Sequence, residues 1–260
     1  MTVPRLRLDG VSVGFGGITA LDGVGLEAAA GEVLGVIGPN GAGKTTLFDV
    51  IAGVRPPSTG VVELDGDDVT RTPSVARARR GVRRTFQRVQ TFGWLTVEDN
   101  VLAATEWRGG GGGALADVVA WPARRRRERE RRALVAATLE HCGLTEVKDE
   151  PAGSLPIGIA RMVELARAIV DEPRLLLLDE PASGLDDGEI ERLGAQVQRV
   201  RRETGCAVLL VEHNAGFVMG ESDRIVVLDQ GRVLAHGLPA DIQRDPAVRA
   251  AYLGETEVSA

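Results

Sequence analysis

A glycine-rich stretch early in the chain carries the residue types that bind phosphate. Residues 38–46 read Gly-Pro-Asn-Gly-Ala-Gly-Lys-Thr-Thr and satisfy the pattern G-x-x-x-x-G-K-[ST]. Glycine lets backbone N–H groups turn toward phosphate oxygens, and the helix expected next adds its positive end. Lys44 would neutralise the β- and γ-phosphates, and the Thr45 hydroxyl would hold Mg²⁺. The candidate nucleotide-binding residues are Gly38, Asn40, Gly41, Ala42, Gly43, Lys44, Thr45 and Thr46.

A second candidate site follows the apolar run Leu175–Leu178, where Asp179 and Glu180 stand side by side. Open α/β sheets bind ligands at the carboxyl ends of their strands, and buried charges there need a cation. Asp179 is expected in the Mg²⁺ shell, and Glu180 is expected to polarise a water for attack on the γ-phosphorus. The alternative is an exposed turn that ends the strand before Pro181.

The elements that must position these residues alternate between strand and helix patterns. The apolar run Val33–Ile37 enters the glycine-rich loop, and a helical pattern follows it. Ala207–Val211 predicts another buried strand, whereas residues 97–170 are mostly helical in pattern. Two strand-and-helix regions on either side of a helical insert indicate an α/β fold with a mostly parallel sheet.

Composition excludes several classes of protein. The chain has 260 residues, of which 43% are hydrophobic and 26% charged, and its formal net charge is -6. These values are typical of a globular protein and argue against a bulk nucleic-acid binder. Two cysteines, Cys142 and Cys206, are too few for a disulfide scaffold, so a reducing, cytosolic setting is expected. No apolar run approaches a membrane span, which leaves a membrane-bound partner open.

Five motifs in order resemble the ATP-binding subunits of ABC transporters. They are residues 38–46, Thr85-Phe86-Gln87, residues 175–181, Ser183-Gly184-Leu185-Asp186 and Val211-Glu212-His213. The resemblance covers nearly the whole chain. It implies a P-loop NTPase of the ABC type, with an antiparallel N-terminal β subdomain, a parallel-sheet core and an inserted α-helical subdomain. We expect one domain over residues 1–260, with 1–87 and 171–260 as catalytic core and 88–170 as helical subdomain.

The resemblance also assigns roles to single residues. Gln87 resembles the lid-loop glutamine that senses the γ-phosphate, Mg²⁺ or attacking water, and His213 resembles the switch histidine that contacts the γ-phosphate. Asp186 resembles the aspartate that links two ATP sites, and Phe15 resembles the aromatic residue that stacks on adenine. From the residues alone, Phe15 could equally be a core residue, Gln87 a solvated turn residue and His213 a helix cap.

The segment 154–161 stands where the family has its LSGGQ signature, which contacts the nucleotide of the opposite subunit. The residues that fit are Leu155, Gly158 and Arg161, and those that depart from the pattern are Pro156, Ile157 and Ile159. Proline offers neither a hydroxyl nor an N–H to a phosphate. The departures predict a weaker ATP site at this signature, and they leave open a regulatory subunit that hydrolyses ATP poorly.

The lid sequence Arg-Thr-Phe-Gln and the ending Tyr252-Leu253-Gly254-Glu255 resemble subunits that drive import of branched-chain or other hydrophobic amino acids. Lipopolysaccharide-transport ATPases share the ending, so a lipid-type transport ATPase is the alternative. The expected cofactors are ATP and Mg²⁺. The expected partners are a second ATPase subunit, identical or homologous, permease subunits and, indirectly, a solute-binding protein. The expected place is the cytoplasmic face of the plasma membrane, with Arg83, Arg84 and Arg88 toward the permease.

Overall fold

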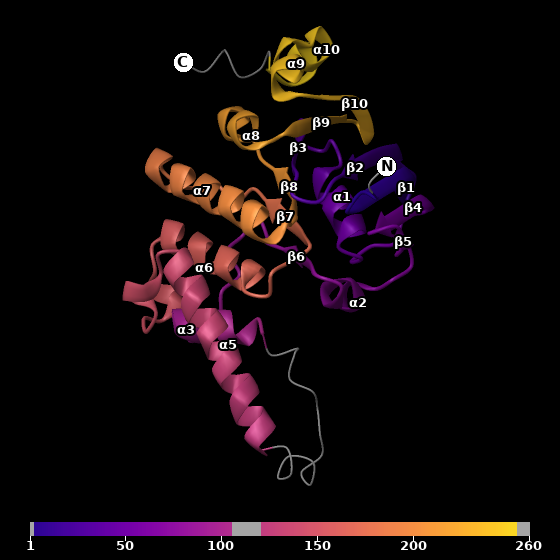
Figure 1. The fold of residues 1–260 in the computed structure, drawn as a ribbon. Coiled ribbons are helices and arrows are strands. Elements are labelled where there is room, and N and C mark those ends of the chain that lie inside the picture. Colours follow the sequence, from indigo (N-terminus) through magenta and orange to yellow (C-terminus); the bar gives the residue numbers. More distant parts are fainter. Residues whose placement is uncertain (1–2, 106–120, 254–260) are drawn as a thin grey trace. The chain divides into compact units, whose positions relative to one another are not determined.

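The computed structural model describes residues 3–105 and 121–253, which residue contacts divide into two compact units (Figure 1). The first unit holds the described residues up to Gln87, Pro173–Ser183 and the residues from Ile190 onward. The second unit holds Arg88–Glu172 and Gly184–Glu189. No helix among the described residues is both long and apolar enough to cross a membrane.

One sheet of the first unit is antiparallel and has the strand order β2-β1-β4-β5. Its strands are β1 (Leu6–Phe15), β2 (Ile18–Ala28), β4 (Thr59–Leu64) and β5 (Asp67–Asp68). Buried and exposed residues alternate along β1, as in Leu6, Arg7 and Leu8, so one face of the sheet lies on the core. The predicted antiparallel N-terminal β subdomain is confirmed.

The second sheet has the order β10-β9-β3-β8-β7-β6, and all its neighbours are parallel except β10 and β9. Its strands are β3 (Val33–Ile37), β6 (Val82–Arg84), β7 (Leu175–Asp179), β8 (Ala207–Val211), β9 (Arg224–Asp229) and β10 (Arg232–Gly237). Every residue of β3, β7 and β8 is buried, as expected of central strands covered on both faces. The predicted parallel-sheet core is confirmed.

Helices complete the first unit. They are α1 (Lys44–Ile51), α2 (Ser74–Arg79), α8 (Ala215–Glu221), α9 (Pro239–Arg244), α10 (Pro246–Val248) and, from Ile190 onward, α7 (Asp187–Thr204). The buried residues Leu47, Phe48 and Ile51 of α1 join side chains of both sheets in one hydrophobic core. This packing fixes the helix whose first residue is Lys44.

Arg77 of α2 is fully buried, although arginine is almost always exposed unless it is paired. Its guanidinium donates hydrogen bonds of 2.6 to 3.2 Å to five backbone carbonyls. The acceptors are the carbonyls of Thr72, Val50, Ile51, Val69 and Thr70. Burial lowers the pKa of Arg77 to about 10, and the charge of Asp68 opposes that shift. Because Val50 and Ile51 end α1, Arg77 caps the helix that begins with Lys44.

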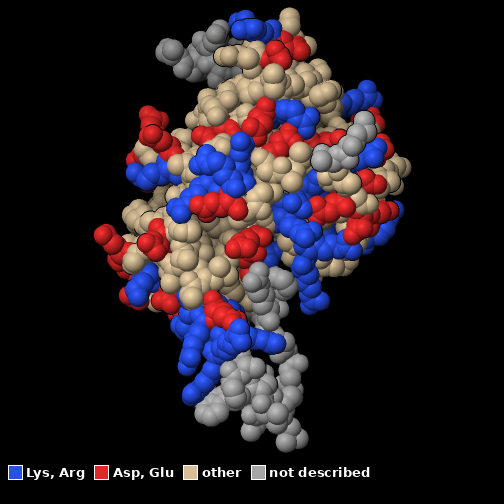
Figure 2. Space-filling view, viewed as in Figure 1, with Lys and Arg blue, Asp and Glu red and all other residues tan. Residues whose placement is uncertain are grey.

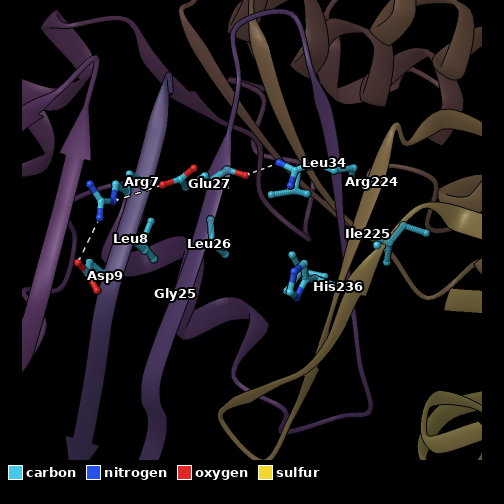
Figure 3. Close-up of a pocket in the computed structure, with 12 residues that line it drawn as sticks. Arg7, Leu8, Asp9, Gly25, Leu26, Glu27, Leu34, Arg224, Ile225 and His236 are labelled. Atoms are coloured by element: carbon cyan, nitrogen blue, oxygen red, sulfur yellow. Dashed lines mark hydrogen bonds and ion pairs between the residues drawn. The ribbon is translucent and has the colours of Figure 1, made fainter. Parts of the chain in front are cut away.

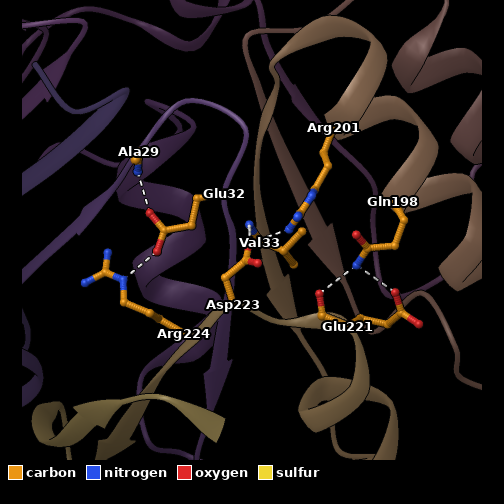
Figure 4. A network of polar contacts seen from close by, with 8 residues as sticks. All are labelled: Ala29, Glu32, Val33, Gln198, Arg201, Glu221, Asp223 and Arg224. Carbon is orange, nitrogen blue, oxygen red and sulfur yellow. Dashed lines mark hydrogen bonds and ion pairs between the residues drawn. The ribbon is translucent and has the colours of Figure 1, made fainter. Parts of the chain in front are cut away.

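Charged side chains pair where β9 begins beside β3 (Figure 4). Glu32 accepts a hydrogen bond of 2.5 Å from Arg224, whose pKa that bond raises. Asp223 accepts from the backbone N–H of Val33 at 2.8 Å and from Arg201 of α7. These bonds hold the start of β3, the strand that leads into the phosphate loop.

The second unit is helical and has its own core. Its helices are α3 (Val97–Ala103), α5 (Trp121–His141) and α6 (Ile157–Ile169), with short 3₁₀ turns at Thr145–Val147 and Ala152–Ser154. Val101, Val135 and Val163 meet in that core, one from each helix. Basic side chains gather over α5 (Figure 2). On this helix, Arg126 and Arg132 form exposed ion pairs with Glu130 and Glu128, respectively. The predicted α-helical subdomain is confirmed as a fold element.

Candidate nucleotide-binding site

The phosphate loop connects β3 to α1, which is the strand–loop–helix order that the sequence predicts. Gly38 has φ 155°, and a Cβ on it would lie 2.1 Å from the carbonyl oxygen of Leu228. Gly43, directly before α1, has φ 103°, and its Cβ would lie 2.5 Å from the carbonyl oxygen of Ala20. Both positions therefore require glycine, because any side chain would collide with backbone. The backbone of β9 at Leu228 and of β2 at Ala20 therefore limits the path of the loop.

Lys44 folds back onto the loop that precedes it. Its Nζ donates to the carbonyl oxygens of Gly38 at 2.5 Å and Pro39 at 3.0 Å. Burial lowers the pKa of Lys44, and the nearby carboxylates Glu180 and Asp179 oppose that shift. The ammonium is thus held by two neutral carbonyls, which a phosphate group would replace as a stronger, charged acceptor.

The other predicted residues of the loop differ in exposure. Asn40, Gly41 and Thr45 are exposed, whereas Ala42 is buried and accepts a hydrogen bond of 3.0 Å from the N–H of Gly231. Thr46 is half-buried in the first turn of α1. Solvent therefore reaches Asn40, Gly41 and Thr45, three of the residues that are predicted to meet phosphate and Mg²⁺.

Asp179 ends β7 and is buried, as predicted for a charge at the carboxyl end of a central strand. Its Oδ2 accepts a hydrogen bond of 2.9 Å from Arg84. Burial raises the pKa of Asp179, whereas the hydrogen bond and charge of Arg84 lower it. The sequence did not predict this partner. Arg84 was expected to face a permease, and that expectation is wrong because only 10% of its side chain is exposed.

Glu180 is the meeting point of the three predicted catalytic residues. Its Oε2 accepts a hydrogen bond of 2.9 Å from Nε2 of Gln87, and its Oε1 lies 2.9 Å from Nε2 of His213. The backbone of Glu180 has φ 50°, and its N–H donates to the carbonyl of Val211 at 2.9 Å. Left-handed backbone is unfavourable for a residue with a Cβ, and such strain clusters at functional sites.

Glu212 is a buried acid to which sequence reasoning gave no role. Its Oε1 accepts from the N–H of Ala182 at 2.6 Å, and its Oε2 accepts from the N–H of His213 at 3.0 Å. Burial raises the pKa of Glu212, while hydrogen bonds from backbone N–H groups lower it. Glu212 therefore links the segment that follows Glu180 to the start of the loop that follows β8. An acid directly after a fully apolar strand was the signal that could have identified it.

Phe15 ends β1, and 39% of its surface is exposed. The guanidinium carbon of Arg55 lies 4.3 Å from the centre of its ring, a cation–π contact. Phe15 is therefore not the buried core residue that the strand pattern allowed. A flat base can stack on the exposed part of such a ring.

The other predicted nucleotide-binding residues, Leu155, Gly158 and Asp186, belong to the second unit. Leu155 packs against that unit's core, and Gly158 is buried in the first turn of α6. Asp186 precedes α7, where its Oδ1 accepts from the N–H of Glu189 and its own N–H donates to the Glu189 carboxylate. A Cβ on Gly158 would lie 1.9 Å from Oε1 of that same Glu189. Pro156 stands at the N-cap of α6.

A pocket of about 330 Å³ opens among β1, β2, β3, β9 and β10 and contains none of the predicted site residues (Figure 3). Arg7 lies on one of its walls and pairs with Asp9 and Glu27, and Arg224 lies on another. Because acidic and basic groups alternate around it, the pocket carries no excess of one charge to select a ligand.

Comparison with known proteins agrees with this geometry. Residues 21–183 match the family model described as ABC transporter, and residues 232–258 match that of the branched-chain amino acid ATP-binding cassette transporter. The high-affinity branched-chain amino acid transport ATP-binding protein BraF of Pseudomonas aeruginosa is 43% identical over 98% of this chain and 100% of its own length. Its counterpart LivG of Escherichia coli is 39% identical over the same shares.

A solved structure is similar over its whole fold. The crystal structure of a nucleotide-free ATP-binding cassette from an ABC transporter superposes with a TM-score of 0.83 at 28% identity, covering 96% of this chain and 98% of that chain. The matches to branched-chain amino acid cassettes favour that group over the lipid-type alternative. The chain therefore belongs to the ABC transporter family, as an ATP-binding protein similar to those of branched-chain amino acid transport.

Proposed function

We propose that the chain binds MgATP and hydrolyses it to power a membrane importer of branched-chain or other hydrophobic amino acids. The observation that carries the proposal is the carboxylate of Glu180, held at 2.9 Å by both Gln87 and His213 in the unit that contains the phosphate loop. The names of the relatives support the substrate class.

The residues present fit magnesium as part of a metal–nucleotide complex. Thr45 and Asp179 offer a hydroxyl and a carboxylate, the hard oxygen ligands that Mg²⁺ prefers. Within residues 3–105 and 121–253, no group of three or more His, Cys, Asp or Glu residues could hold a metal ion. Phosphate oxygens would therefore complete the shell, as is usual for Mg²⁺. The bound ion would neutralise charge on the phosphates, with Gln87 as a further contact.

The remaining groups of the site act by position and charge. Lys44 exchanges its two carbonyl acceptors for the β- and γ-phosphates, and N–H groups of the loop would donate to the same phosphates. Glu180 accepts a hydrogen bond from water and orients it toward the γ-phosphorus. His213 contacts the γ-phosphate once it is there, and Gln87 senses it. Phe15, backed by Arg55, stacks on adenine.

Assembly follows from the family. We propose that both units form one ABC domain and that two such subunits, identical or homologous, share their ATP sites. Leu155, Gly158 and Asp186 would then serve the nucleotide of the other subunit. The pair would sit on permease subunits at the cytoplasmic face of the plasma membrane, with a solute-binding protein as an indirect partner and no nucleic acid.

A second candidate is a regulatory subunit that binds nucleotide but hydrolyses it poorly. The cap of α6 favours it, since Pro156 makes no side-chain cap hydrogen bond and has no N–H. The substitution Pro156→Ser in the assembled transporter distinguishes the two. Under this second candidate it raises ATP turnover or affinity, and an unchanged rate and affinity would remove the reason for proposing it.

The main test is the substitution Glu180→Gln in the assembled transporter. We expect it to keep ATP binding and to reduce phosphate release at least about 100-fold, because the water loses its charged acceptor. The substitution Glu191→Gln, on an exposed part of α7, makes the same charge change and should leave turnover unaltered. Undiminished hydrolysis by Glu180→Gln would refute the role given to Glu180.

A further inference from the structure

Arg84 holds two acidic residues at once. Its Nη1 donates to Oδ1 of Asp49 at 2.6 Å, and its Nη2 donates to Oδ2 of Asp179 at 2.9 Å. The exposed fractions of the three side chains are 10% for Arg84, 29% for Asp49 and 7% for Asp179. The arginine thus bridges two carboxylates in a site that is largely closed to solvent.

The two acids come from the elements that are proposed to hold the metal. Asp49 lies on α1 one turn after Thr45, so the two side chains share a face of that helix. Asp179 ends β7, the strand that pairs in parallel with β6. Arg84 ends β6 and therefore joins the helix of the phosphate loop to the strand of the proposed metal ligand.

The surroundings keep the arginine in place. The guanidinium carbon lies 5.7 Å from the ring centre of Phe48 and 5.3 Å from that of Phe86. Directly after Arg84, the N–H of Thr85 donates to the carbonyl of Leu177 at 2.9 Å. A cation fixed between two aromatic rings and two carboxylates loses little freedom when it forms these bonds.

Two carboxylates from neighbouring elements would otherwise attract a divalent cation. Buried acids need a positive partner, and a fixed arginine supplies it without any bound ion. The guanidinium also repels a second cation, since like charges in a poorly solvated site repel strongly. Only a divalent metal ion that is already bound to negative phosphates has enough oxygen ligands to bind next to the guanidinium of Arg84.

We propose that Arg84 is a positioning residue that serves as the internal cation of Asp49 and Asp179 and excludes divalent metal until nucleotide phosphates bring it. This inference rests on the proposed function, because it takes Asp179 as a group of the MgATP site. The inference predicts that divalent cations do not change the melting temperature of the nucleotide-free wild type. It also predicts that they raise the melting temperature of a variant without the Arg84 charge.

The test is thermal unfolding of the full chain without nucleotide, in EDTA and in millimolar MnCl₂, for the wild type and Arg84→Gln. We expect the variant to melt about 5 °C or more below wild type in EDTA, because two acids lose their cation. Mn²⁺ should restore at least about half of that loss and leave the wild type unchanged. Arg83→Gln is the matched control: Arg83, on the same strand, donates to the carbonyls of Ala78 and Val82, so its variant should not respond to Mn²⁺.

Three results would overturn the proposal. They are a melting temperature of Arg84→Gln equal to that of Arg83→Gln, a loss that Mn²⁺ does not reduce, and millimolar-range Mn²⁺ binding by the nucleotide-free wild type. The last is read from the electron paramagnetic resonance signal of free Mn²⁺ and needs no variant. ATP binding is measured separately with a fluorescent analogue, so failure of the proposed function shows as lost nucleotide binding by the wild type, whatever Mn²⁺ does.

Discussion

Replacing the buried Arg77 with methionine should destabilise the first unit more than its place in a short surface helix suggests. Methionine has a similar length and no donors, so it fills much of the volume but leaves the backbone carbonyls around it without their guanidinium partner. Arg77 donates five hydrogen bonds to backbone carbonyls. Two of the lost hydrogen bonds are at the C-terminal end of α1, the helix that begins with Lys44.

The expected cost follows from those five carbonyls. Two of them keep a second donor, because Val50 also accepts from the N–H of Gly53 and Val69 also accepts from the N–H of Thr72. About three buried carbonyls then lose a partner at about 1 to 3 kcal/mol each. Relief from burying a guanidinium offsets part of this loss. We expect a free energy of unfolding lower by about 4 kcal/mol, or a melting temperature lower by about 8 to 16 °C.

Urea unfolding of the full chain, followed by circular dichroism, measures this difference. The control is Arg79→Met, which changes an exposed arginine of the same helix and should alter the free energy of unfolding by about 0.5 kcal/mol or less. If Arg77→Met costs less than about 1 kcal/mol, then Arg77 does not secure the end of α1 and the reasoning fails.

Two further predictions concern a carboxylate beside β3 and a glycine of the second unit. Burial alone would raise the pKa of Asp223, but hydrogen bonds from Arg201 and the N–H of Val33 lower it, so its stabilisation is present above pH 3.8 and is lost as the pH falls through the folded-state pKa. Asp223→Asn should therefore lower the free energy of unfolding by about 1 kcal/mol or less at pH 7, since the side chain is 43% exposed. Urea titrations of both proteins should converge as the pH falls from 3.8 through the folded-state pKa. Gly158→Ala should lower the free energy of unfolding by about 1 kcal/mol, because the added methyl group displaces the Glu189 carboxylate from its cap of α7. In a Glu189→Ala background, the same substitution should have no such effect. A cost in that background equal to the cost in wild type would contradict this account.

The fold was predictable because its signals are local. Continuous apolar runs such as Leu175–Leu178 mark central strands, and the glycine-rich loop before Lys44 marks the start of a helix. The helical insert followed from the helical pattern of residues 97–170, whereas the antiparallel subdomain followed from the family resemblance. Boundaries differed slightly, as in the apolar run Leu175–Leu178, which is part of a strand that spans Leu175–Asp179.

The contacts that complete the site were not predictable from spacing. Arg77 meets Val50, which lies 27 positions away, and Arg84 meets Asp179 across 95 positions. In a chain whose basic residues are nearly all arginine, neither differs in sequence from an arginine at the surface. Glu212 is similar, because only the folded chain brings its carboxylate to the N–H of Ala182. Such partners depend on packing between elements, which local pattern does not encode.

The left-handed backbone of Glu180 has an evolutionary consequence. At φ 50°, a residue with a Cβ costs the fold about 1 kcal/mol relative to glycine. Selection for a stable chain therefore favours glycine or asparagine at this position, whereas selection for ATP turnover would keep the carboxylate if Glu180 orients water as proposed. The two pressures would then act in opposite directions on a single codon, and this acid would persist only while ATP turnover is under selection. Copies of the chain released from that selection should lose Glu180 before they lose the residues that hold the sheet together.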